Sequence, residues 1–163
     1  MGAQPTEQPI DRSDDLDGYL EQVRLRRAEL GESMGALEGV LKESVADLAH
    51  WQERLRAALL EVHHDLVTHI EVTERPGGLY DSLREEAARL AGTLRRLQGE
   101  HPGLLAATDD LLARVAEGTE FAAGELTAVT AQVKDLLRRL GHHRQRGADL
   151  IFEAYQLDVG GLG

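Results

Sequence analysis

The stretch LRAALLEVHHDLVTHIEVT, residues 55–73, decides the fold of this chain. Read in alternating steps of four and three residues, it gives the series Leu55, Leu59, Val62, Leu66, His69 and Thr73. Apolar residues at this spacing form one stripe along an α-helix, and a globular protein buries that stripe in its core. The stretch therefore predicts an amphipathic helix. His69 interrupts its apolar stripe, although burying an imidazole without a partner costs roughly a few kcal/mol.

Two further stretches carry the same kind of stripe with one histidine in each. The residues of these two stripes are Leu90, Leu94, Leu97, His101, Leu104, Thr108 and Leu111, followed by Val129, Val133, Leu136, Leu140, His143, Gly147 and Leu150. One histidine on each of three core stripes predicts a polar layer inside a helical bundle. The interior of a bundle, between facing helices, is where such proteins build metal sites.

The composition supports a helical domain. The chain has 163 residues, of which 42% are hydrophobic, and this is enough for one domain with a core. Leu, Ala, Glu and Arg dominate, and these residues favour helices. Runs of β-branched and aromatic residues, which would indicate strands, are missing. The fold class predicted from composition is therefore all-α.

The first half of the chain predicts two long helices. Residues 1–14 are polar and are expected to form a flexible N-terminal arm, with the first helix starting near Asp14. The stripe of this helix contains a cation, Arg27, between apolar residues. The chain must turn between residues 42 and 48, where Ser44 and Asp47 are candidate N-caps. The second helix runs to about Glu74 and stops at residues 75–78, Arg-Pro-Gly-Gly.

The second half predicts two more helices. The third helix begins near residues 80–81, and Pro102 is expected to kink or split it, because proline disfavours helical geometry in the residue before it. Gly118 ends this helix, and the fourth runs from about residue 119 to Leu157, followed by a flexible tail at residues 159–163. Four long amphipathic helices with short connections over residues 15–158 predict an up-down-up-down four-helix bundle.

Charge and motifs narrow the function classes. The net charge is −11, so the basic footprint that nucleic-acid binding needs is missing, and attraction to an anionic membrane surface is not expected. The absence of cysteine excludes thiolate metal sites and cysteine nucleophiles, and no apolar run approaches the ~18 residues of a membrane span. We therefore expect a cytoplasmic protein, for which a homodimer is possible.

The amino-acid sequence around the three histidines resembles that of the hemerythrin-like family of cation-binding domains. The matching stretches are HIEVTERPGGLY at residues 69–80, GEHPGLL at residues 99–105 and HHRQRGADLIFEAYQLDVGG at residues 142–161. The resemblance covers nearly the whole chain and implies a four-helix bundle. In that family, histidines and carboxylates from the four helices hold two iron ions. The resemblance therefore implies iron, as one or two ions, as the cofactor, and O2, NO or peroxide as the bound small molecule.

The chain departs from the family pattern at several ligand positions. Arg27 stands on the first-helix stripe where the family has a histidine. Four residues past His69 is Thr73 rather than a carboxylate, and Glu74 follows one step further around the helix. No carboxylate stands four residues past His101 or His143 either. The expected site is therefore reduced to three histidines, with Glu74 or water as the fourth ligand.

Four other residues are expected around this site. Arg27 either anchors an anionic ligand or pairs with Glu100 or Glu74 in place of the lost metals. Thr73 and Tyr155 are expected beside the histidine layer.

Three interpretations of function remain open. The first is a hemerythrin-like protein that binds iron or another divalent metal and carries, senses or detoxifies O2, NO or peroxide. The second is a bundle without metal that serves as a binding or scaffolding module, with each histidine bonded to a backbone carbonyl or carboxylate. The third is an enzyme that uses a non-heme metal to activate O2.

Overall fold

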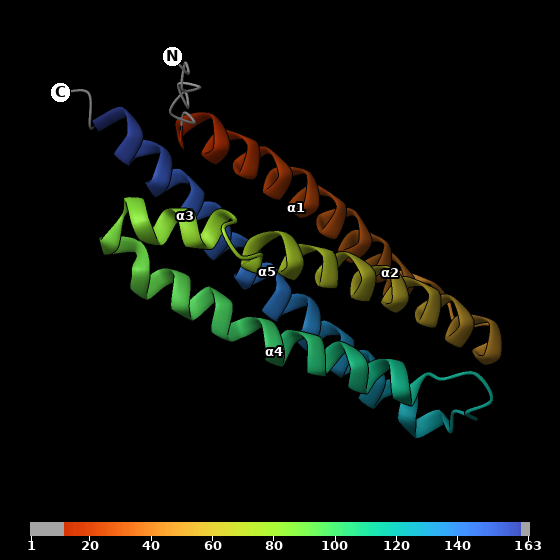
Figure 1. The fold of residues 1–163 in the computed structure, drawn as a ribbon. Helices are drawn as coiled ribbons and strands as arrows, with labels where there is room; N and C mark the ends of the chain where they lie inside the picture. The colour runs from red at the N-terminus through yellow and green to blue at the C-terminus, as the bar shows by residue number, and fades with distance from the viewer. Residues whose placement is uncertain (1–11, 161–163) are drawn as a thin grey trace, which may run out of the picture.

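A computed structural model describes residues 12–160, except for the side chains of residues 12–15, 86, 123, 155 and 157–160. The described part is helical and contains no strand, which confirms the all-α prediction. Four helices are long and two elements are short, and Figure 1 shows how the α-helices are arranged. The long helices are α1 (Arg12–Lys42), α2 (Leu48–Glu74), α4 (Ala91–Arg114) and α5 (Ala123–Gly160). The short elements are α3 (Leu79–Glu86) and the 3₁₀ turn η1 (Ala88–Leu90).

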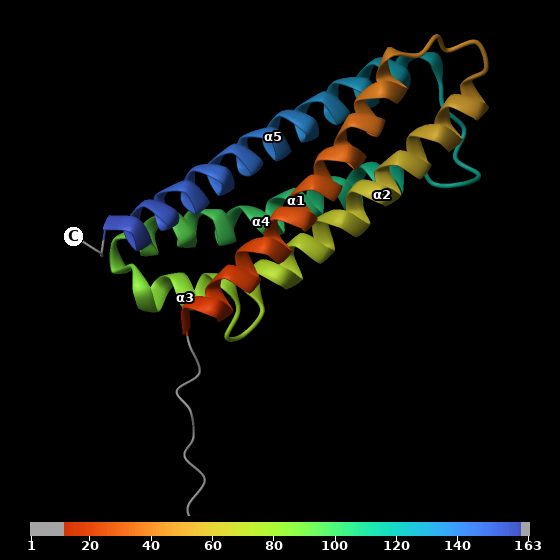
Figure 2. The same cartoon turned by 90° about the horizontal axis from the view of Figure 1, so that it is seen from above.

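The four long helices enclose one interior. α1 packs against α2, α2 against α4, α4 against α5, and α5 against α1. The loops at residues 43–47 and 115–122 lie at one end of the molecule, and α3 lies at the other (Figure 2). This arrangement is consistent with a four-helix bundle. Within residues 12–160, no helix combines the length and apolarity needed to cross a bilayer.

The turn signals around α2 act as the sequence predicts. The carboxylate of Asp47 caps the N-terminus of α2 by accepting a hydrogen bond from the backbone N–H of His50 at 3.2 Å. At the other end, Gly77 adopts φ +71°, a left-handed conformation that side chains rarely take, and lets the chain reverse toward α3. The start of α1 at Arg12 lies two residues before the expected start, and most of the expected N-terminal arm, residues 1–11, lies outside the described residues.

The expected split of the third helix at Pro102 is wrong. α4 continues through Pro102, and the chain breaks earlier, at Ala87, where the backbone is extended (φ −140°, ψ 77°). Pro102 lies on the exposed side of α4, so water can hydrate the carbonyl that its missing N–H leaves without a partner. The boundaries also shift further along. α4 ends at Arg114, before Gly118, and α5 runs from Ala123 to Gly160 rather than from residue 119 to residue 157.

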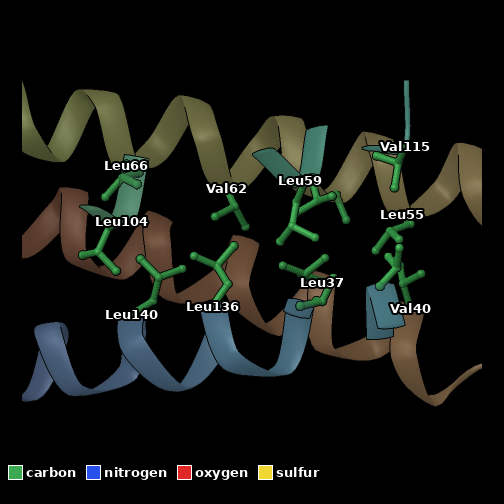
Figure 3. Packing of buried hydrophobic residues seen from close by; sticks show 14 of the residues in the cluster. Leu37, Val40, Leu55, Leu59, Val62, Leu66, Leu104, Val115, Leu136 and Leu140 are labelled. Carbon is green, nitrogen blue, oxygen red and sulfur yellow. The ribbon is translucent and has the colours of Figure 1, made fainter. Parts of the chain in front are cut away.

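The predicted stripes are the core of the bundle, and one polar layer divides it. The apolar stripe residues of α2, α4 and α5 named above are buried. Buried residues form two hydrophobic clusters. One lies toward the loops at residues 43–47 and 115–122, and Figure 3 shows part of it. The other surrounds α3. Between the two clusters, each long helix contributes one polar residue of its stripe. This polar layer consists of the buried residues His69, His101 and His143 and the half-buried Arg27, which lines the same small cavity as His69 and His143.

Leucine to alanine substitutions at neighbouring positions of α2 test the stripe. Leu59 is fully buried in the larger cluster, whereas Leu60 is 46% exposed. Leu59→Ala should lower the free energy of unfolding by about 2–5 kcal/mol, because it leaves a cavity in a close-packed core. Leu60→Ala should change it by less than about 0.5 kcal/mol. Urea unfolding of both variants measures the difference, and equal effects would contradict the assigned helix face.

Candidate metal centre

Three imidazole rings converge in the middle of the bundle. His69 of α2, His101 of α4 and His143 of α5 are each at most 5% exposed. The Nε2 atom of His143 lies 3.2 Å from Nε2 of His69 and 3.1 Å from Nε2 of His101. One nitrogen from each ring lies within 4.8 Å of the other two. The structure therefore brings together the three histidines that the stripes single out.

Carboxylates lie on the opposite, Nδ1 side of two of these rings. Oε1 of Glu74 lies 2.8 Å from Nδ1 of His101. Oε2 of Glu100 lies 3.8 Å from Nδ1 of His143, and both oxygens of Glu100 accept hydrogen bonds from the guanidinium of Arg146. Glu74 was expected as a fourth ligand, but the structure places it behind the ring of His101. From there it orients the ring, as carboxylates behind metal-bound histidines do.

Neutral histidines can make both hydrogen bonds between the rings only by sharing a single proton on Nε2 of His143. A carboxylate only accepts, so the Nδ1–H of His101 donates to Glu74, and its Nε2 is left as a lone pair. A neutral His143 can place at most one proton on Nε2, yet this atom has two close Nε2 neighbours. If that proton is present, the Nδ1 of His143 presents a lone pair to Glu100. If it is absent, two lone pairs face each other at 3.1 Å.

The rings do not resolve this conflict by taking up extra protons at neutral pH. Burial, followed by repulsion from His101, His143, Arg27 and Arg144, lowers the pKa of His69 to about 3. Burial and the neighbouring His101 lower the pKa of His143 to about 4, against the attraction of Glu100. Burial also lowers the pKa of His101, although Glu74 opposes the shift. All three rings are therefore neutral at pH 7, which is the protonation state of a metal ligand.

The spacing of the nitrogens suits a single small cation. Metal–nitrogen bonds of about 2.0–2.1 Å at a tetrahedral angle place two ligand nitrogens about 3.3 Å apart. Two of the three Nε2 separations, 3.1 and 3.2 Å, are close to this value, and the ligand nitrogens of the third pair, His69 and His101, lie within 4.8 Å of each other. Three imidazoles suit zinc, copper, iron or nickel better than magnesium or calcium, which prefer oxygen.

The other residues expected at the site have different partners. Arg27 does not pair with Glu74 or Glu100, because its Nη2 donates to the backbone carbonyl of Arg144 at 3.0 Å. The Thr73 hydroxyl is buried beside the layer and donates to the backbone carbonyl of His69 at 2.9 Å, which is a local helix contact. The side chain of Tyr155 lies outside the described residues.

Three residues of the site were not predicted from the sequence. Tyr80 of α3 stacks on the ring of His101, with centroids 6.3 Å apart, and burial raises its pKa to about 12. Arg146 holds Glu100, and Arg144 reaches across to α1. A signal for Arg144 exists in the sequence, because Gly31 stands in the middle of α1, where glycine weakens a helix, and this position makes room for the arginine.

Comparisons of the chain with protein-family models, curated proteins and solved structures find no match. The resemblance to the hemerythrin-like family therefore stays a prediction.

The depressed histidine pKa values predict how the metal-free protein responds to acid. In the unfolded chain these groups titrate near 6.5, so between about pH 6.5 and pH 4 the unfolded state binds protons that the folded state excludes. The free energy of unfolding should therefore fall as the pH falls through this window. His69→Leu removes one such group, and the slope against pH should decrease by up to about 1.4 kcal/mol per pH unit.

Urea unfolding in EDTA, at a series of pH values across this window, measures both slopes. The carboxylates titrate in both proteins, so the difference between the two slopes reports the histidine. Parallel curves for the wild type and His69→Leu would show that His69 is not held neutral by burial.

Proposed function

We propose that this helical bundle binds one divalent transition-metal ion through the Nε2 atoms of His69, His101 and His143. One observation carries the proposal: three buried imidazole nitrogens converge in the middle of the bundle, within 4.8 Å of one another, and neutral rings can place only a single shared proton between them. A cation between these nitrogens accepts a lone pair from all three. The remaining ring protons then lie on Nδ1, where Glu74 and Glu100 face the rings of His101 and His143.

The protein groups around the three nitrogens favour one ion over two. Glu74 and Glu100 lie behind the rings, so neither carboxylate is placed to bridge a pair of metals. Arg27, on α1, brings a permanent positive charge to the layer, and this charge would repel a second dication. This favours a reduced site over the full di-iron centre of the hemerythrin-like family. The up-down-up-down, hemerythrin-like assignment of the bundle remains part of this proposal.

Three protein ligands leave a coordination position for a small molecule. A metal supplies there the capacity to bind or activate a small ligand. We infer binding or sensing of such a molecule as the role of the site, and O2, NO or peroxide, named by the family resemblance, are the first ligands to test.

Elemental analysis after dialysis against limiting iron(II) or zinc tests the proposal. The wild type should retain about one metal ion per chain, because the three buried imidazoles supply the ligands for one ion. His143→Ala should retain none, because this ring contacts both of the others. The matched control is His64→Ala, an exposed histidine on α2 that should leave the stoichiometry unchanged.

A second variant tests the role of the Glu74 carboxylate, which lies behind the ring of His101. Glu74→Gln keeps the shape of the side chain but removes its charge, and should weaken metal affinity about 10–100-fold without abolishing binding. A wild type that retains no metal would overturn the proposal and favour the scaffolding interpretation. Two ions per chain would contradict the single-ion site.

A further inference from the structure

Two arginines from different helices lie against each other beside the histidines. Nη2 of Arg27, on α1, donates to the carbonyl of Arg144 at 3.0 Å. Nη2 of Arg144, on α5, donates to the carbonyl of Arg27 at 3.2 Å. These reciprocal bonds hold both guanidinium groups at the seam between α1 and α5, where each lines the same small cavity.

Gly31 of α1 provides the space for this contact. A Cβ atom at this position would lie 2.6 Å from Nη2 of Arg144, closer than such contacts occur in proteins. The glycine weakens the middle of α1 by about 0.5–1 kcal/mol relative to alanine. At Gly35, one turn further along α1, a Cβ would meet nothing within 4 Å.

No carboxylate neutralises this pair of cations. In the part of the chain that the structure describes, neither Arg27 nor Arg144 has a carboxylate within 4.0 Å. Both hydrogen-bond partners of the pair are neutral carbonyls, although a guanidinium group bonds most strongly to an anion. Burial, followed by repulsion from Arg144, lowers the pKa of Arg27, which is the direction that an uncompensated like-charge pair gives.

Several residues that line the cavity carry buried nitrogens without hydrogen-bond partners. Its lining includes Arg27, Arg144, His69 and His143, and its volume is about 20 Å³. The Nε atoms of both arginines are buried and bond to no described atom, and the same holds for Nδ1 of His69. Since His69 directs Nε2 toward Nε2 of His143, its Nδ1 is the nitrogen that carries the proton when Nε2 offers a lone pair. Buried donors without partners are rare in native proteins and call for a specific explanation.

We propose that the seam between Arg27 and Arg144 is a binding site for a small inorganic anion of the size of chloride. Three buried N–H donors, two permanent positive charges and a cavity with room for one atom-sized occupant define the chemistry. The anion neutralises the arginine pair. The site does not require the metal, because the protein supplies both charges.

The experiment compares thermal unfolding of EDTA-treated protein in sodium chloride and in sodium gluconate at the same ionic strength. Equal ionic strength keeps charge screening the same in both salts, and gluconate is too large for the cavity. Chloride should raise the melting temperature by about 2–4 °C and the rise should grow with the logarithm of the chloride concentration. Identical melting temperatures in the two salts would overturn the proposal.

Two variants with matched controls locate the effect. Arg27→Met should lose the chloride-dependent rise, whereas Arg95→Met, at an exposed arginine of α4, should keep it. Gly31→Ala should also reduce the rise, because the new methyl group displaces the guanidinium of Arg144, whereas Gly35→Ala should not. A full rise in Arg27→Met would contradict the assignment to this seam.

A crystal of the wild-type protein grown in sodium bromide locates the bound anion without any substitution. It should show an anomalous peak between the guanidinium groups of Arg27 and Arg144, and its absence there would contradict the proposal. The two proposals can also fail separately. Metal stoichiometry tests the histidine site alone, and chloride dependence after EDTA treatment tests the arginine site alone.

Discussion

The structure depends on one constraint, the need to satisfy a polar layer in the middle of an apolar bundle. Each long helix places one polar residue of its core stripe in this layer: Arg27, His69, His101 and His143. Leucine at these positions would join the two hydrophobic clusters into one. The layer therefore lowers the hydrophobic stability of the bundle, and a group bound there is the simplest compensation for buried nitrogens that have no hydrogen-bond partner among the described residues.

Charge is distributed unevenly across this layer. On one side, Glu74 and Glu100 face the Nδ1 atoms of His101 and His143, and the carboxylates favour a cation at the common centre of the rings. On the other side, Arg27 and Arg144 face a small cavity without a carboxylate. A cation and an anion bound on these two sides would attract each other, and in a region of low dielectric this attraction would lower the free-energy cost of burying each charge.

Periodicity predicts much of this protein but not the parts that depend on long side chains. The stripes placed the three histidines correctly, because core burial follows from spacing along a helix. The position of Glu74 behind His101 depends on how α2 packs against α4, which no local pattern contains. Arg144 stands beside the stripe of α5, and its guanidinium group donates to a backbone carbonyl of α1, a contact that no local pattern contains. The break at Ala87 could not be predicted, because no glycine or proline marks it. The one proline within the third predicted helix, Pro102, does not interrupt α4.

X-ray absorption spectroscopy of the protein loaded with zinc or iron(II) tests the central claim most directly. The account predicts a first shell dominated by nitrogen at about 2.0–2.1 Å, with the outer-shell scattering of three imidazoles. This pattern should be lost in His101→Ala, whose ring contributes one of the converging nitrogens. A shell of oxygen ligands without imidazole scattering would contradict the account, because the ion would then be bound at the acidic surface.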